Sequence, residues 1–130
     1  MGEKKRVVIV DDSPLSSGQL VEFFTSKMNF DIAGLGTDGN AALDLYRTHK
    51  PDLITLDITM PNKDGETATI EILQEFPDAK IIIISALHTD ATLRCLSAGA
   101  SGYFPKPIKL NSPENMSELI STVNRILGDE

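Results

Sequence analysis

The chain of 130 residues has the length and the 41% hydrophobic content of one globular domain, and its formal net charge is −7. An acidic domain is not expected to bind nucleic acid or an anionic membrane directly, and apolar runs of only strand length exclude a transmembrane helix. The single cysteine, Cys95, excludes an internal disulfide and fits a cytoplasmic protein.

Short apolar runs alternate with amphipathic helical patterns along the whole chain. After the first run, Ser13-Pro14 supplies a helix cap and a proline suited to the first helical turn. Near the fifth run, Pro105 and Pro107 indicate an edge strand, because proline cannot donate to a strand ladder. The predicted strands are 7–10, 31–36, 53–57, 80–85 and 101–104, and the predicted helices are 14–28, 39–50, 65–76, 89–98 and 113–127.

Five strand–helix units follow one another without a break in composition, a repeat or a low-complexity segment. They predict one doubly wound α/β domain over residues 1–130, with a five-stranded parallel sheet and five helices. Right-handed crossovers bring the carboxyl ends of all strands to one rim of such a sheet, where ligands bind. We therefore expect the functional residues at that rim.

The predicted rim collects three carboxylates, one hydroxyl and one ammonium group, which belong to Asp11, Asp12, Asp57, Ser85 and Lys106. Crowded carboxylates repel one another and need a cation, and their oxygens suit Mg²⁺, which prefers one or two carboxylates plus a substrate phosphate. An aspartate can accept a phosphoryl group, while a lysine and a serine can bind its oxygens. The rim therefore predicts a magnesium-dependent site that accepts a phosphoryl group on Asp57.

These residues also have purely structural interpretations. A strand-end aspartate such as Asp57 can cap the next helix, and Asp11 with Asp12 can be an acidic pair at a helix start. Ser85 can be an ordinary strand-end hydroxyl, and Tyr103 an ordinary aromatic of an edge strand. The gathering of these charges at one rim favours the phosphoryl-accepting site over the structural interpretations.

Four motifs, in this order and spacing, resemble the receiver domain of the two-component response-regulator family over essentially the whole chain. The motifs are Val10-Asp11-Asp12-Ser13, 56–65, Ile84-Ser85-Ala86 and 99–107. The resemblance implies a flavodoxin-like sheet with strand order 2-1-3-4-5. It also implies that Asp57 takes phosphate from a histidine kinase or a small phosphodonor. Asp11 and Asp12 would organise Mg²⁺, with the backbone carbonyl of Thr59 as a further ligand.

The same resemblance implies a conformational switch. Ser85 and Tyr103 would form the switch pair, and Lys106 would be the phosphate partner, followed by a cis peptide bond to Pro107. A downstream output protein would read the changed surface of segments 89–98, 101–104 and 113–127. The protein would be a monomer, or a dimer that forms on phosphorylation.

Three features depart from the common family pattern. Ser85 stands where threonine is frequent, which keeps the hydroxyl, and segment 108–115 is longer than the usual link into the last helix. Leu87 is bulky, and by resemblance it flanks the path of a hydrolytic water together with the short Thr59. We expect slow loss of phosphate, so that shut-off needs a phosphatase or back-transfer to the kinase. A Leu87 side chain that swings outward would instead leave the path open.

Two other classes of function stay open. An aspartyl-phosphate hydrolase on a similar sheet would carry a second aspartate two residues after the nucleophile, where this chain has Thr59, and a cap insertion. A receiver fragment of a longer DNA-binding response regulator would continue beyond the last helix, whereas this chain runs from Met1 to Glu130. We therefore predict a single-domain, chemotaxis-type switch that is not an enzyme, apart from catalysing its own phosphorylation and dephosphorylation.

Overall fold

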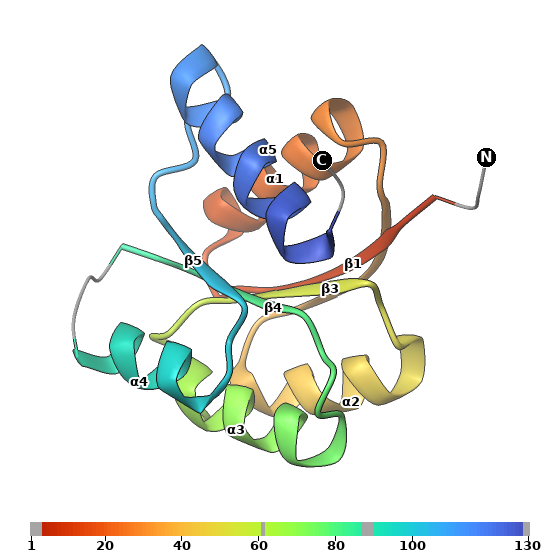
Figure 1. Cartoon of the computed structure of the whole chain (residues 1–130), viewed down its shortest axis with the longest axis vertical. Helices are drawn as coiled ribbons and strands as arrows, with labels where there is room; N and C mark the ends of the chain where they lie inside the picture. Colours follow the sequence, from red (N-terminus) through yellow and green to blue (C-terminus); the bar gives the residue numbers. More distant parts are fainter. Residues whose placement is uncertain (1–3, 61, 87–89, 129–130) are drawn as a thin grey trace.

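The computed structural model describes residues 4–60, 62–86 and 90–128, which form one parallel sheet between two layers of helices (Figure 1). The strand order is β2-β1-β3-β4-β5, and every neighbouring pair is parallel. The predicted flavodoxin-like fold with order 2-1-3-4-5 is thereby confirmed. The strands are β1 (Arg6–Val10), β2 (Asp31–Gly36), β3 (Leu53–Leu56), β4 (Ile81–Ser85) and β5 (Gly102–Pro105). The helices are α1 (Pro14–Glu22), α2 (Gly39–His49), α3 (Gly65–Glu75), α4 (Asp90–Ala98) and α5 (Pro113–Leu127).

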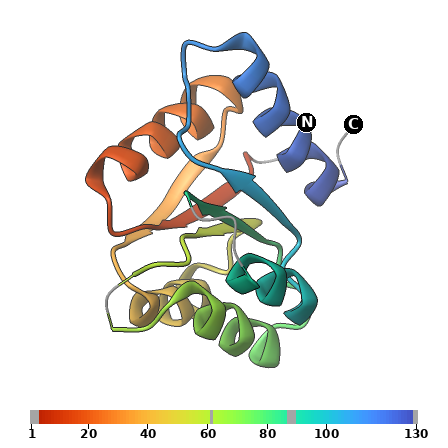
Figure 2. The ribbon, with the colours of Figure 1, turned by 90° about the vertical axis from the view of Figure 1, so that its left-hand side faces the viewer.

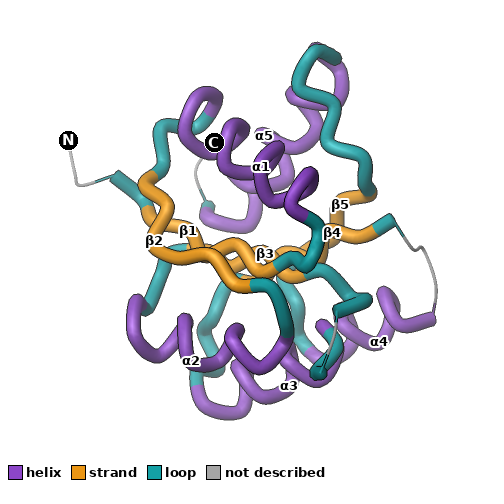
Figure 3. Tube along the Cα trace, turned by 180° about the vertical axis from the view of Figure 1, so that it is seen from behind, coloured by secondary structure: helices purple, strands orange, loops and turns teal. Residues whose placement is uncertain are grey.

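The sheet is buried on both faces. Helices α1 and α5 cover one face, and α2, α3 and α4 cover the other (Figures 2 and 3). Because successive strand residues point to opposite faces, Val7 and Ile9 pack under α1 and α5, while Val8 and Val10 pack under the other layer. A strand buried in this way needs an unbroken apolar run, which is the pattern seen in the sequence.

Side-chain caps fix where four of the helices begin. Asp38 and Asp64 accept hydrogen bonds from the third backbone N–H beyond each of them, at 3.0 and 2.8 Å. Ser13 and Ser112 cap α1 and α5 in the same way. Each cap satisfies an N–H group that has no partner inside its helix. The predicted starts of the helices 14–28 and 113–127 are confirmed.

Helix α1 ends earlier than the predicted 14–28, because a π-helical turn follows it over Phe23–Lys27. The Thr25 hydroxyl donates to the Val21 carbonyl at 2.8 Å and so competes for a backbone acceptor of the helix. Both Phe23 and Phe24 are fully buried, with ring centroids 5.0 Å apart. The wider turn therefore lets two consecutive aromatic rings enter the core, which a continuous α-helix would point in different directions.

Apart from β2, each strand differs from the prediction by one residue at one or both ends. Strand β3 ends at Leu56, although the N–H of Asp57 still donates to the Val10 carbonyl at 3.1 Å. Strand β5 ends at Pro105, and the next N–H, that of Lys106, donates to the Ser85 carbonyl at 3.0 Å. As predicted, β5 is an edge strand, where proline is normally found in a sheet, and the Ser85 carbonyl opposite Pro105 accepts from Lys106.

Helix α5 shows a clear apolar stripe. Met116, Leu119, Val123 and Ile126 are buried, and Ile120 and Leu127 are partly buried. The helix has 15 residues, which is shorter than a membrane-spanning helix. In the part of the chain that the structure describes, no helix combines the length and the apolar character needed to cross a membrane.

Candidate functional site

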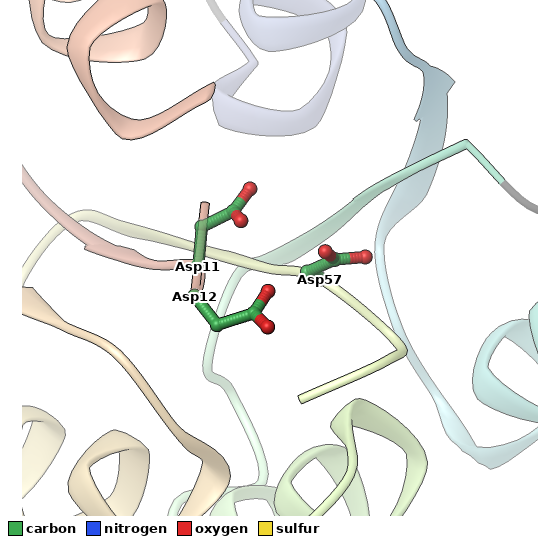
Figure 4. Close-up of side chains that lie close together, drawn as sticks. All are labelled: Asp11, Asp12 and Asp57. Atoms are coloured by element: carbon green, nitrogen blue, oxygen red, sulfur yellow. The ribbon is translucent and has the colours of Figure 1, made fainter. Parts of the chain in front are cut away.

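Three carboxylates gather between the end of β1 and the end of β3 (Figure 4). One oxygen from each of Asp11, Asp12 and Asp57 lies within 4.8 Å of the others. Asp11 and Asp57 are buried, whereas Asp12 is exposed. Backbone N–H groups hold the two buried side chains: Ser13 donates to Asp11 Oδ1 at 2.9 Å, and Ile58 donates to Asp57 Oδ1 at 2.7 Å.

Lys106 lies between the two buried carboxylates. Its Nζ is 2.8 Å from Asp11 Oδ2 and 3.0 Å from Asp57 Oδ2, and only 13% of its side chain is exposed. The end of β5 positions this lysine, because the Lys106 N–H is bound to the Ser85 carbonyl. The peptide bond from Lys106 to Pro107 is cis, as the resemblance implied.

The electrostatics of the cluster follow from this burial. Burial raises the pKa of Asp11 above its ordinary value, and hydrogen bonds from Lys106 and Ser13 offset the rise only in part. Burial alone would lower the pKa of Lys106, but its hydrogen bonds to Asp11 and Asp57 outweigh that effect and raise the pKa. The single ammonium group contacts two of the three clustered carboxylates, so the cluster carries a surplus of negative charge.

The donor set fits Mg²⁺. All the clustered ligand atoms are carboxylate oxygens, which a hard cation prefers, and the exposed Asp12 leaves a side of the cluster open to water. A divalent cation would also favour the ionised form of Asp11, whose pKa burial raises. Asp11, Asp12 and Asp57 are therefore the residues that could hold such an ion.

A tight turn between Ile58 and Gly65 packs against the backbone of Asp57. The Gly65 N–H donates to the Ile58 carbonyl at 2.9 Å. A Cβ atom on Gly65 would lie only 2.1 Å from the backbone oxygen of Asp57, which no side chain permits. The turn after β3 can close only because this residue is glycine.

Ser85 and Tyr103 lie on neighbouring strands at the same rim. Ser85 is 1% exposed, and the Tyr103 hydroxyl donates to the Ser85 backbone carbonyl at 3.4 Å. The Tyr103 ring is half-buried and packs against the apolar cluster under α2, α3 and α4. The two predicted switch residues are therefore adjacent, while their roles stay predictions.

Thr59 and Leu87 are the two residues predicted to flank the path of the hydrolytic water. Thr59 follows Asp57 by two residues and is exposed at the rim. Leu87 lies outside the described residues, so its predicted position beside the phosphoryl group stays a prediction.

The sequence did not reveal a link between the turn after β3 and the start of α2. The Asn62 amide donates to Asp38 Oδ2 at 2.6 Å, and this bond, followed by that from the Ala41 N–H, lowers the pKa of Asp38. A Cβ atom on Gly39 would collide with the backbone of Lys63, so the two segments are in close contact. Asp38 was identifiable as a helix cap, but nothing in the sequence signalled its second partner, which is 24 residues away.

Comparison with known proteins gives a consistent picture at the level of sequence. The family model of the response regulator receiver domain matches residues 7–120. The chemotaxis protein CheY of Thermotoga maritima is 37% identical over 122 residues, which are 93% of this chain and 98% of that protein. A protein-glutamate methylesterase/protein-glutamine glutaminase of Shewanella sp. is 36% identical over 115 residues, but the match spans only 32% of that relative.

Solved structures that are similar to this chain agree with the family match. A chain in the crystal structure of the CheX-CheY-BeF3-Mg+2 complex from Borrelia burgdorferi is similar, with a TM-score of 0.84 and 34% identity, over 94% of this chain and 88% of that one. The response regulator domain of Thermotoga maritima CheB is similar with a TM-score of 0.86 and 29% identity, over 98% of this chain and 99% of that one.

Proposed function

Because this chain belongs to the family of response regulator receiver domains of two-component signalling, we propose that it is a phosphoryl-accepting switch in which Asp57 is the acceptor. The observation that carries the proposal is the position of Lys106, whose Nζ lies 3.0 Å from the Asp57 carboxylate in a cluster of three aspartates. We also propose that the receiver domain extends over residues 1–130, beyond the matched 7–120.

In the proposed reaction, the Asp57 carboxylate attacks the phosphorus of a phosphohistidine on a kinase. A new oxygen–phosphorus bond forms, the nitrogen–phosphorus bond breaks, and the histidine leaves with the electron pair of that bond. Lys106 would then pair with a phosphoryl oxygen, and the buried Ser85 would bind another. Asp11, Asp12, Asp57 and the Thr59 carbonyl would hold Mg²⁺, which when bound neutralises charge on the phosphoryl oxygens.

The proposed output is a change at β5 and its neighbours. A phosphoryl group on Asp57 would draw Ser85 toward it, and the Tyr103 side chain would turn further inward. The hydrogen bond from Tyr103 to the Ser85 backbone supports a connection between the two residues. A downstream protein would read the surface formed by α4, β5 and α5. Loss of phosphate would be slow, since Thr59 offers only a short hydroxyl to position water.

The proposed partners are a histidine kinase, an output protein and a phosphatase, with the receiver acting as a monomer or as a dimer formed on phosphorylation. Phosphorylation by such a kinase requires a cytoplasmic location. The match to about a third of the methylesterase relatives favours a second possibility, in which this domain regulates a longer chain. In either case we propose that the domain itself performs no chemistry except on its own Asp57, and that it does not contact nucleic acid.

Acetyl phosphate labelling in Mg²⁺ buffer tests the proposal. Asp57→Asn should abolish the added phosphoryl mass, whereas Asp12→Ala should weaken labelling in a way that extra Mg²⁺ partly restores. Asp52→Asn is a control, since it changes an exposed aspartate at the opposite end of the sheet. An Asp57→Asn protein that still gains one phosphoryl group on an aspartate would refute the assignment.

A further inference from the structure

The opposite end of the sheet carries a second charged hollow that the proposed phosphoryl chemistry does not use. A cleft of about 300 Å³ opens there, lined by Lys4, Lys5, Arg6, Lys50 and Asp52. These residues come from three places in the fold: the approach to β1, the end of α2 and the approach to β3. Four of the twelve basic residues of an acidic chain thus surround one hollow.

The local backbone fixes the geometry of this cleft. Arg6 donates from Nη1 to the His49 carbonyl at 2.7 Å, which ties the start of β1 to the end of α2. Lys50 ends α2 in the left-handed conformation, with φ 42°, and its N–H is bound to the Tyr46 carbonyl at 2.8 Å. The basic side chains therefore project from an ordered frame.

Two carboxylates at this end of the sheet, both in the described part of the chain, already have partners. The Asp52 carboxylate accepts the Arg6 N–H at 2.8 Å, and the Asp31 carboxylate pairs with Lys4 at 3.7 Å. A cation at the end of a helix stabilises the helix dipole, which accounts for Lys50. Lys4, Lys5 and Arg6 lie on no helix, so the helix dipole does not explain why they gather at this cleft. The lining residues carry four positive charges and one negative charge, a combination that attracts anions.

The lining also indicates which anion fits. Among the residues that the structure describes, the five that line the cleft are all charged, and none of them offers an aromatic or aliphatic side chain for a nucleobase or an apolar peptide anchor. Three ammonium groups and one guanidinium match several phosphate groups close together, since both bind phosphate oxygens through charge-assisted hydrogen bonds. We propose that this cleft binds an oligophosphate group, such as the triphosphate of a small molecule, through its phosphates alone.

Two-dimensional ¹H–¹⁵N NMR of the full chain tests the proposal, with sodium triphosphate as the probe in Mg²⁺-free, low-salt buffer. Saturable shifts should appear at the amides of Arg6, Lys50 and Asp52, and triphosphate should bind more tightly than orthophosphate. ATP should bind no more tightly than triphosphate, because the described lining residues are all charged and offer no surface for the base. Lys50→Gln should weaken binding about tenfold, the usual effect of one charge-assisted contact.

Matched variants make the result decisive. Lys109→Gln removes the same charge from an exposed site near α5 and should leave the affinity unchanged. Equal weakening in both variants would mean that triphosphate senses only net charge, and citrate binding as tightly as triphosphate would mean that any polyanion suffices. Shifts confined to Asp57 and Lys106, tighter binding of ATP, or binding of a glutamate-rich peptide in place of triphosphate would each overturn the proposal.

Discussion

The two ends of the sheet carry lysine–aspartate pairs in very different surroundings. At the carboxyl end, the Lys106 side chain is 13% exposed, and its partners Asp11 and Asp57 are 2% and 9% exposed at 2.8 and 3.0 Å. At the amino end, Lys4 and Asp31 are 51% and 61% exposed, and their charged atoms are 3.7 Å apart. The residue types are the same, so any difference in behaviour must come from burial, from the distance between the charges and from the number of partners.

Burial decides whether a charge can be removed without consequence. Water and salt screen an exposed pair, which contributes about 0–1 kcal/mol to stability. Removing one partner of a buried pair costs about 3–5 kcal/mol, because the other charge stays behind without compensation. The carboxyl end therefore behaves as one coupled unit that can respond to an added phosphoryl group, whereas the charges of the amino end act independently.

The largest effect should come from the turn that supports the buried cluster. Gly65→Ala should lower the free energy of unfolding by about 3 kcal/mol or more, because the new Cβ would lie 2.1 Å from the Asp57 backbone oxygen. Urea denaturation measures this. Gly18→Ala is the control, since nothing lies within 4 Å of a Cβ there, and it should stabilise α1 by about 0.5–1 kcal/mol. A tolerated Gly65→Ala would show that the turn is less constrained than these contacts imply.

Removal of the buried Lys106 ammonium group should cause the second-largest loss of stability. Lys106→Met should destabilise the Mg²⁺-free protein by about 2–4 kcal/mol at pH 7, since Asp11 and Asp57 lose their counter-charge. Mg²⁺ should restore part of the loss, and it should stabilise this variant more than the parent. Equal effects of Mg²⁺ on both proteins would contradict a shared role of the lysine and the metal in balancing the aspartates.

The pH dependence of the same variant sharpens the comparison. Because the pKa of Asp11 is raised, the folded state binds a proton on this carboxylate more tightly than the unfolded state does. Stability therefore falls as the pH rises from 3.8, the ordinary pKa, to the pKa of Asp11 in the folded protein. Without Lys106 that pKa should rise further, and the loss should extend to higher pH. Urea curves of Lys106→Met should therefore approach those of the parent near pH 4. In the parent, Lys106 has a raised pKa, so its contribution to the stability of the fold is complete below pH 10.5. That contribution is lost as the pH rises through the pKa that Lys106 has in the folded state.

A smaller change in stability, this time a gain, is expected from a substitution in the middle of the sheet, at Thr55 of β3. The Thr55 hydroxyl, in a residue 1% exposed, has no hydrogen-bond partner among the described residues, and Ile9 and Ile82 are its strand neighbours. Thr55→Val should raise stability by about 1 kcal/mol, since it removes an unsatisfied polar group. Thr69→Val is the matched control: that hydroxyl donates to the Gly65 carbonyl at 2.7 Å, so its loss should destabilise by about 1 kcal/mol. Calorimetric melting temperatures that move in the same direction would contradict the distinction.

The smallest effect belongs to the exposed pair. Lys4→Met should change stability by no more than about 0.5 kcal/mol at pH 7, and salt should abolish the difference. The same substitution at the two ends of the sheet thus measures the effect of burial directly. A Lys4→Met protein as unstable as Lys106→Met would remove the contrast between the two ends.

The sequence predicted the fold because its determinants are local. Continuous apolar runs specify strands that are buried on both faces, and caps such as Ser13 and Asp38 mark helix starts within a few residues. Parallel strands joined by helices must bring their carboxyl ends together, so the meeting of Asp11, Asp12 and Asp57 followed from chain order alone. The end of α1 was wrong, because the π-helical turn depends on how Phe23 and Phe24 fit the core.

Only the tertiary structure decided how the charges pair. Lys106 lies 49 residues from Asp57, and no pattern in the sequence specifies that its ammonium group bridges Asp57 and Asp11. The basic cleft likewise joins the start of β1 to Lys50, more than forty residues away, through a hydrogen bond from Arg6 to a backbone carbonyl. Hydrophobic periodicity fixes which face of each element is buried. Burial and distance between remote side chains arise only when those faces pack, and these two quantities set the strength of every charge interaction in this protein.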